Sequence, residues 1–268
     1  MECEIAEIRA GDGTSSPAVL RVPEGDPPFA GVVAVHGGMG ARSESELVGY
    51  ATTKLPAYLF QHGYAVLTAD YRHPSLGLGE VDDIAAAYEF LCAHEGVDER
   101  RVALGGCSHG GVITYLASAR IRPACVFVEE GQTDFIGGWE LLQEWLRRSP
   151  RPLSEYLEMD VELWQELAER LGGLPHEVPD AYRDASPLAK AAHIQSPILI
   201  MTGDQEYLYH SLEMRDALAA AGRPCAFKLY EYASHAFLFE WKSFHAATRR
   251  ALDDLLEFLD RYLQAPSP

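Results

Sequence analysis

Residues 106–111 (GCSHGG) contain the pattern Gly-x-Ser-x-Gly, with Ser108 at its centre. A short apolar stretch, residues 101–105, precedes the pattern, and residues 112–120 after it have a helical composition. On a sharp turn between strand and helix a serine is exposed, and small neighbours let the strand and helix pass closely. The free N–H groups of the helix would face the atom that the serine attacks. Ser108 is therefore the predicted nucleophile.

A serine needs a base to accept its proton, usually a histidine that a carboxylate holds in the right tautomer. The turn motif is associated with the chain order serine, acid, histidine. His235 is the predicted base because it follows the last predicted strand and precedes the terminal helix. The acid is expected after the strand predicted at residues 197–201. Glu206 is favoured because it is the third residue after a glycine, and Asp204 is the alternative.

An acyl-transfer intermediate carries an oxyanion, which two preorganised N–H groups must stabilise. One predicted donor is the backbone N–H of His109, directly after the nucleophile. The second is expected from the HGGM turn after the strand predicted at residues 31–35, with Gly38 and Met39 as the candidates. Glycine lets the backbone approach the substrate closely there. His36 is expected to hold this turn in place.

These residues need a scaffold that brings several loops to one edge of a sheet. Apolar stretches predict strands at residues 3–9, 18–22, 31–35, 64–69, 101–105, 124–128, 197–201 and 226–230. Helical patterns lie at residues 47–62, where Pro56 is expected to kink or shorten the helix, and at 81–94, 112–120, 211–221 and 241–263. This alternation predicts an α/β fold with a mainly parallel sheet covered by helices on both faces. Reactive groups of such folds gather at the carboxyl ends of strands.

Residues 132–190 interrupt the alternation because they contain long amphipathic stretches and no strand candidate. We therefore expect a single domain over residues 1–268, with 132–190 as a helical cap inserted in it. The cap is rich in large apolar side chains, including Trp139 and Trp145. Two interpretations stay open for these side chains. In the first they pack the helices on the domain or form a contact between two copies of the chain. In the second they line an apolar pocket that binds the acyl or alcohol group of a substrate.

Several motifs follow one another in a recognisable order over residues 30–260. They are HGGMG (36–40), DYR (70–72) with GLG (77–79), VDERRV (97–102), GGCSHGG (105–111), ASPL (185–188), PILIMTGDQE (197–206) and SHAF (234–237). In these motifs the chain resembles the α/β-hydrolase superfamily, and within it the catalytic domain of the prolyl oligopeptidase and acylaminoacyl peptidase family and the dienelactone-hydrolase-like esterases. The resemblance implies an α/β-hydrolase fold with a catalytic triad.

The chain departs from that family in two features. The family peptidases carry a β-propeller before the hydrolase domain, whereas roughly thirty residues precede the motifs here. The family also usually has aspartate where this chain has Glu206. The first departure argues against peptidase activity, because the propeller helps to select peptides.

The first predicted function is hydrolysis of small carboxylic esters through an acyl-enzyme on Ser108. The alternative is an aminopeptidase or acylaminoacyl peptidase with the same triad, and a third hypothesis is a non-catalytic binding protein with this fold. A peptidase needs an anchor for the peptide terminus, and the sequence identifies none. Glu129 and Glu130 follow a predicted strand, but they are interpreted as solvated or structural carboxylates. The expected partner is a small ester or a short acyl-peptide, and a homo-oligomer stays open.

Charge and composition exclude several other classes. The formal net charge of −18, from 22 basic and 40 acidic residues, argues against nucleic acid or an anionic membrane as a partner. The five cysteines are scattered without a C-x-x-C pair, which is typical of a cytosolic protein. No secretory signal and no apolar stretch of about 20 residues is seen, so a cytoplasmic protein is expected.

No cofactor or metal is expected either. The glycines after the strand at residues 31–35 lack the third glycine of a dinucleotide fingerprint, because position 43 is serine. The sequence has no phosphate-binding G-x-x-x-x-G-K-[ST] loop. Its histidines and carboxylates show no metal-ligand spacing. A nucleotide-dependent oxidoreductase is therefore discounted.

Overall fold

The computed structural model describes residues 3–38, 42–72, 78–149, 155–204, 208–240 and 245–264. Its strands are β1 (Glu4–Arg9), β2 (Ser15–Arg21), β3 (Phe29–Val35), β4 (Ala65–Ala69), β5 (Val97–Cys107), β6 (Cys125–Glu129), β7 (Ile198–Gly203) and β8 (Cys225–Tyr230). Its α-helices are α1 (Glu44–Thr53), α2 (Leu55–Gln61), α3 (Glu80–Cys92), α4 (His109–Ser118), α5 (Phe135–Arg148), α6 (Glu155–Leu171), α7 (Pro179–Ala185), α8 (Pro187–Lys190), α9 (Leu208–Ala220) and α10 (Ala246–Leu263).

One eight-stranded sheet in the order β1-β2-β4-β3-β5-β6-β7-β8 forms the centre of the molecule. β2 pairs antiparallel with both β1 and β4, and every other pairing is parallel. The prediction of a mainly parallel sheet is confirmed. Because parallel strands end at the same edge of the sheet, the loops after β3, β5, β6, β7 and β8 lie together there.

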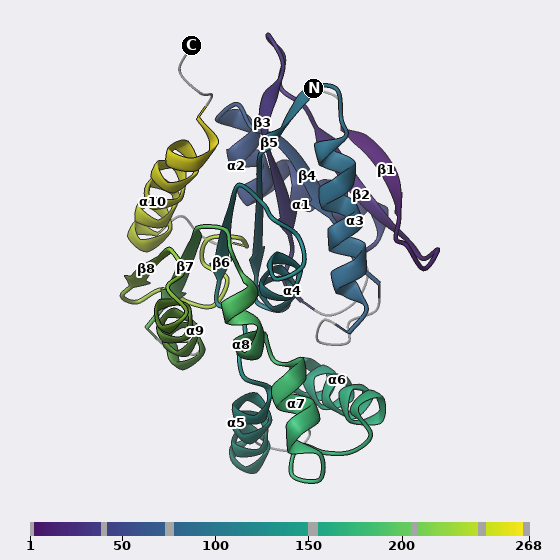
Figure 1. Ribbon diagram of the computed structural model, residues 1–268, viewed down its shortest axis with the longest axis vertical. Helices are drawn as coiled ribbons and strands as arrows, with labels where there is room; N and C mark the ends of the chain where they lie inside the picture. Colours follow the sequence, from purple (N-terminus) through teal and green to yellow (C-terminus); the bar gives the residue numbers. More distant parts are fainter. Residues whose placement is uncertain are drawn as a thin grey trace.

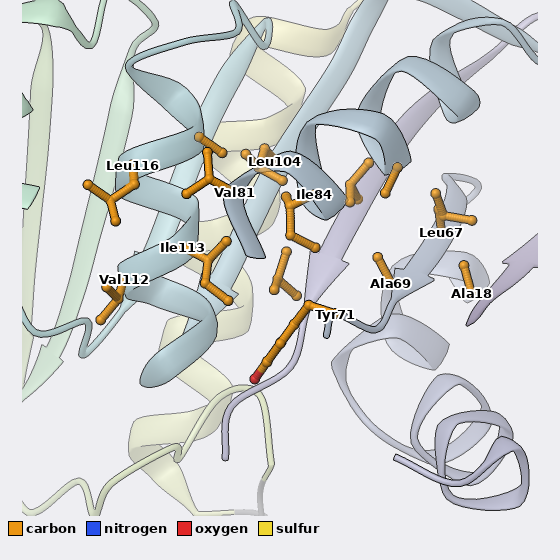
Figure 2. Packing of buried hydrophobic residues seen from close by; sticks show 14 of the residues in the cluster. Ala18, Leu67, Ala69, Tyr71, Val81, Ile84, Leu104, Val112, Ile113 and Leu116 are labelled. Carbon is orange, nitrogen blue, oxygen red and sulfur yellow. The ribbon is translucent and has the colours of Figure 1, made fainter. Parts of the chain in front are cut away.

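Helices cover both faces of the sheet, as the alternation predicts (Figure 1). Successive strand residues point to opposite faces, so Val33 and Val35 pack with α3 and α4, whereas Val32 and Ala34 pack with α2 and α10. Figure 2 shows the first of these cores, with side chains of α3 and α4 gathered around Leu104 of β5. Each such buried aliphatic side chain contributes about 1.5–3 kcal/mol to folding, which fixes the helices firmly to the sheet.

Two elements differ from their predicted bounds. The helix expected over residues 47–62 is two helices, α1 and α2, separated at Lys54, whose backbone is extended. Pro56 has no N–H and its ring crowds the preceding turn, so one continuous helix is disfavoured. β5 begins at Val97, earlier than the predicted residue 101, because Val97 pairs with Phe29 of β3 across an irregularity in the register.

Between β6 and β7 the chain forms α5 to α8, and α5, α6 and α7 lie beyond the carboxyl edge of the sheet (Figure 1). Trp164 is the centre of their core: its ring lies 5.6 Å from that of Trp139 and stacks on Tyr182 at 6.2 Å. Two hydrogen bonds connect the segment that enters this group of helices with the segment that leaves it. The N–H of Leu188 donates to the carbonyl of Thr133, and the N–H of Phe135 donates to the Ser186 hydroxyl.

Candidate active site

The predicted nucleophile lies on a strained turn between β5 and α4. Ser108 has φ 54° and ψ −120°, a conformation that L-residues rarely adopt and that costs about 1–3 kcal/mol. The turn needs the glycines around it. A Cβ on Gly106 would lie 2.3 Å from the carbonyl oxygen of Gly110, and one on Gly110 would lie 2.3 Å from that of His36. Only hydrogen atoms fit at these positions, which explains the Gly-x-Ser-x-Gly spacing.

The predicted base reaches the nucleophile. Nε2 of His235 lies 2.9 Å from the Ser108 hydroxyl oxygen, although the two residues are 127 positions apart. His235 comes from the loop after β8, where Tyr232 and Ala236 also have positive φ values of 61° and 58°. When the hydroxyl donates to Nε2, the ring proton lies on Nδ1. This is the arrangement that a serine nucleophile and its general base require.

Among the described residues, a carboxylate that contacts His235 follows β6, a strand after which the sequence analysis placed no triad acid. Oε2 of Glu130, directly after β6, lies 2.9 Å from Nδ1 of His235, and the Glu130 side chain is only 2% exposed. The contact has the length of an ion pair without the alignment of a hydrogen bond. Catalytic hydrogen bonds often align only when substrate is bound. Of the two interpretations made from the sequence, a solvated Glu130 is wrong because the group is buried, whereas a structural carboxylate agrees with its hydrogen bonds to two backbone N–H groups.

Of the two acids considered from the sequence, only Asp204 lies within the described residues. Glu206 lies outside the described residues. Oδ1 of Asp204 accepts a hydrogen bond of 3.1 Å from the backbone N–H of Tyr232, and it thereby fixes the start of the His235 loop. The sequence signal for Glu130 is its place directly after an apolar strand, at the same sheet edge where Ser108 and His235 are predicted, but that place gives no direction for the side chain.

Glu129, the last residue of β6, holds the other end of the same loop. Its two carboxylate oxygens accept hydrogen bonds from the backbone N–H groups of Leu238 at 2.7 Å and Phe239 at 2.9 Å. Burial and then the neighbouring charge of Glu130 raise the pKa of Glu129 to about 8. Burial also raises the pKa of the Cys107 thiol well above its usual range, so Cys107 stays a neutral thiol beside the nucleophile.

The glycine turn after β3 lies against the nucleophile. A Cβ on Gly37 would lie 3.2 Å from Cβ of Ser108. The Gly37 carbonyl accepts a 3.1 Å hydrogen bond from the Arg42 guanidinium and lies 2.9 Å from Nδ1 of His36. In a trans peptide the N–H points opposite to the preceding carbonyl, so the N–H of Gly38 points away from Arg42. Met39, the other candidate donor, lies outside the described residues.

Two buried residues, Tyr71 and Asp70, contact the residues of this turn through hydrogen bonds. The Tyr71 hydroxyl donates to the carbonyl of Gly38 at 2.9 Å and to that of His36 at 3.3 Å. Oδ1 of Asp70 lies 3.0 Å from Nε2 of His36, and the His36 ring stacks on Tyr71. In Figure 2 the hydroxyl of Tyr71 extends beyond the apolar cluster that holds its ring. Burial raises the pKa of Tyr71 well above its usual value, so the hydroxyl remains a donor.

His109 begins α4, so its backbone N–H belongs to the first turn of that helix, as predicted for an oxyanion donor. Its imidazole has a structural contact: Nε2 lies 3.0 Å from Oε1 of Glu80, and both side chains are almost fully buried. Glu80 is the first residue of α3. The pair therefore ties the start of α3 to the start of α4, close to the nucleophile.

Trp139 and Trp145, the predicted pocket residues, both lie on α5 and are half-buried. Both pack against the core that contains Trp164. This packing fits the first of the two interpretations made from the sequence. Contact of either side chain with a substrate stays a prediction.

Within the described ranges, no group of three or more histidine, cysteine, aspartate or glutamate side chains is arranged to hold a metal ion. The helices in the same ranges include none that is both long and apolar enough to cross a membrane. The site is thus built from a serine, a histidine and buried carboxylates.

A mainly parallel sheet, a strained serine turn after a central strand and a histidine after the last strand together define the class of α/β hydrolases. Residues 32–239 match the alpha/beta hydrolase fold family, and the chain belongs to that family. The resemblance and fold class predicted from the motifs are thereby confirmed.

The chain is similar to several characterised proteins. It is 28% identical over 209 residues to the acylamino-acid-releasing enzyme of Rattus norvegicus, a match that covers 68% of this chain and 26% of that enzyme. The chain thus spans about a quarter of the length of that relative. The carboxylesterase EstE1 from a metagenomic library has a similar fold, with TM-score 0.76, 22% identity and coverage of 98% of this chain and 90% of that chain. The acylaminoacyl peptidase of Pyrococcus horikoshii also superposes, with TM-score 0.73, 18% identity and coverage of 99% and 42%.

Proposed function

We propose that the protein is a serine hydrolase that cleaves small carboxylic esters through an acyl-enzyme on Ser108. The observation that carries the proposal is the 2.9 Å approach of His235 Nε2 to the Ser108 hydroxyl on a strained turn. Membership of the alpha/beta hydrolase fold family supports hydrolysis as the reaction class.

In this reaction the Ser108 oxygen attacks the ester carbonyl carbon while Nε2 of His235 accepts the hydroxyl proton. The tetrahedral intermediate then carries its negative charge on the former carbonyl oxygen. The backbone N–H groups of His109 and of Gly38 or Met39 are the proposed donors to it, each worth roughly 3 kcal/mol. His235 passes its proton to the leaving alcohol, and the acyl group remains on Ser108. Water then attacks the acyl-enzyme with His235 again as the base, which releases the acid.

The third member of the triad is a carboxylate beside Nδ1 of His235. The sequence favours Glu206, with Asp204 as the alternative. The contact that Asp204 makes with the N–H of Tyr232 supports a role in holding the loop. Glu206 stays a prediction, and the experiment proposed below compares it with Glu130.

The second candidate function is removal of an acylated residue from a short peptide by the same triad. The similarity to the rat acylamino-acid-releasing enzyme favours it. The two candidates differ in the leaving group, an alcohol or an amine.

The first test replaces the nucleophile. Ser108→Ala is expected to abolish hydrolysis of p-nitrophenyl acetate and covalent labelling by a fluorophosphonate, while the far-UV circular dichroism stays that of the wild type. Ser118→Ala is the matched control: this serine lies on the same helix and donates to the Thr114 carbonyl at 2.6 Å. Turnover or labelling that persists in Ser108→Ala would contradict the proposal, and a wild type without either would favour a binding protein.

The second measurement separates the two candidates. Wild-type kcat/KM is compared for p-nitrophenyl esters of increasing acyl length and for N-acetylaminoacyl p-nitroanilides. We expect the esters to be preferred by at least tenfold over the matched anilides after subtraction of uncatalysed hydrolysis. A preference for the anilides would support the acylaminoacyl peptidase and refute the esterase assignment.

A further inference from the structure

We propose that Glu130, at the end of β6, is the carboxylate that orients His235 in the catalytic triad. The inference rests on the proposed function, because it takes His235 as the base for Ser108. It assigns to β6 a positioning residue that the motif places after β7. The observation behind it is the 2.9 Å separation of Glu130 Oε2 from Nδ1 of His235, on the side of the ring opposite to Ser108.

Both oxygens of the Glu130 carboxylate are held in place by backbone N–H groups. Oε1 accepts from Gly203 at 2.9 Å, and Oε2 accepts from Ala236 at 3.0 Å. The first donor ends β7 and the second directly follows His235. A carboxylate fixed in this way cannot rotate freely, so it can hold the imidazole in one orientation.

The backbone is arranged to accommodate this side chain. Glu130 has φ 52°, a positive value that a non-glycine residue adopts only at an energetic cost. Gly203 has no side chain where a Cβ would lie 3.0 Å from Oε1 of Glu130 and 2.5 Å from the carbonyl oxygen of Ala233. The positive φ of Glu130 and the glycine at position 203 are both explained if the Glu130 carboxylate must be held at a fixed position.

The position of β6 in the sheet makes the assignment geometrically direct. β6 lies between β5 and β7, and Glu129 is the register partner of Cys107, the residue before the nucleophile. The N–H of Ser108 donates to the carbonyl of Glu129 at 2.9 Å. Glu130 therefore leaves the sheet directly beside the serine turn. An acid directly after the adjacent strand needs no long loop to reach the histidine.

The test compares Glu130→Gln, Glu130→Asp and Glu206→Gln in the full chain, with p-nitrophenyl acetate as substrate. Loss of the orienting carboxylate is expected to lower kcat about 10²–10⁴-fold in Glu130→Gln. KM should change less than threefold, because the substrate does not touch this residue. The kcat of Glu130→Asp should be at least tenfold higher than that of Glu130→Gln. The kcat of Glu206→Gln should stay within tenfold of the wild-type value. Asp254→Asn, which removes a carboxylate from the hydroxyl of Tyr230 on β8, is the matched control.

A spectroscopic readout tests the contact independently of rate. The Nδ1 proton of His235, assigned by its loss in His235→Gln, should be strongly shifted downfield in the proton NMR spectrum. The resonance should persist in Glu206→Gln and disappear in folded Glu130→Gln. If Glu130→Gln does not fold, Glu206→Gln alone decides: retention of the resonance and of kcat supports Glu130, and their loss assigns the role to Glu206.

Failure of this proposal and failure of the proposed function give different results. A folded Glu130→Gln with kcat within tenfold of the wild type overturns the role of Glu130 but leaves Ser108 as the nucleophile. Activity that survives in Ser108→Ala overturns both.

Discussion

Tyr71 connects the hydrophobic core to the chemistry of the site. Its ring is fully buried between α3 and α4 and the His36 ring, and its hydroxyl donates to two carbonyls of the glycine turn. These hydrogen bonds fix the orientation of the two carbonyls. The N–H groups of the turn are proposed to stabilise an oxyanion that exists only in the transition state and the intermediate.

Tyr71→Phe therefore tests the support of the oxyanion donors. We expect kcat to fall about 10–100-fold, since the loss of orientation corresponds to about 1.4–2.8 kcal/mol of transition-state stabilisation. KM should stay nearly constant, because the ground state does not use these donors. Tyr64→Phe is the control, as it removes a hydroxyl that donates to Asp260 at the amino end of β4. An unchanged kcat in Tyr71→Phe would refute the role of this turn.

Ser108 and His235 could be found from the sequence, because local chemistry constrains them. The serine turn needs glycines at fixed spacing, and the histidine must follow the last strand. Glu130 could not be found in the same way, since its contact with His235 depends on the reach of a side chain across 105 positions of sequence. Spacing rules give the positions of loops at the sheet edge, whereas the direction of each side chain depends on backbone angles such as the φ of 52° at Glu130.

Among the helices, α9 has an unusual internal residue. His210 is 3% exposed, and its carbonyl accepts a 3.0 Å hydrogen bond from the hydroxyl of Thr133, next to the start of α5. Because that hydroxyl donates its hydrogen to the carbonyl, Nδ1 of His210, 3.4 Å away, would contact it as the donor. His210 thus joins α9 to the segment that leads into the cap helices.

The stability of this junction should depend on pH. Burial lowers the pKa of His210 to about 4, against a smaller opposing effect of the Asp134 charge. Between about pH 6.5 and pH 4 the unfolded chain binds a proton that the folded protein does not. Stability therefore falls as the pH falls through this window, by up to about 3 kcal/mol from this residue.

The measurement compares thermal unfolding of the wild type and His210→Asn at pH 7 and pH 4.5. We expect the decrease in Tm between the two pH values to be smaller in the variant, because asparagine does not titrate. His193→Asn, which changes an exposed histidine, should keep the wild-type decrease. Equal decreases in the wild type and His210→Asn would contradict the prediction.

The central strands β3, β4, β6 and β7 were predictable because they are short and mostly apolar, as in residues 31–35 of β3. The exact ends were not, since β5 extends back to Val97 only through its pairing with Phe29 of β3. The break at Lys54 had a visible signal in Pro56, but the sequence did not indicate whether the helix bends or ends. Non-local pairing and packing decide such boundaries.

The molecule as a whole consists of a broad sheet domain and a smaller group of helices at its carboxyl edge (Figure 1). Trp164, which is 4% exposed, belongs to the same apolar cluster as the side chains of α3 and α4, so the core of these helices is continuous with that of the sheet domain. We propose that this group acts as the cap predicted over residues 132–190. Its role would be to limit which acyl groups reach Ser108.

Trp164→Ala tests the cap. Loss of this buried ring is expected to lower stability by about 3–5 kcal/mol and to raise KM for p-nitrophenyl octanoate at least fivefold, with little change for the acetate. Phe258→Ala removes a buried ring from α10, on the sheet domain. It should lower Tm without changing the ratio of the two KM values. A ratio that is unchanged in Trp164→Ala would show that the helices do not select the acyl group.

The separation of 127 positions in sequence between Ser108 and His235 also has a consequence for the protein during its synthesis. During synthesis the ribosome releases the serine turn long before it releases β8 and the loop that follows. A nascent chain can fold β3, β4 and β5 around the serine while no base stands beside it. The growing polypeptide is therefore expected to be chemically inert toward metabolites of the cell until its last strand docks, so that hydrolysis begins only with a fully built domain.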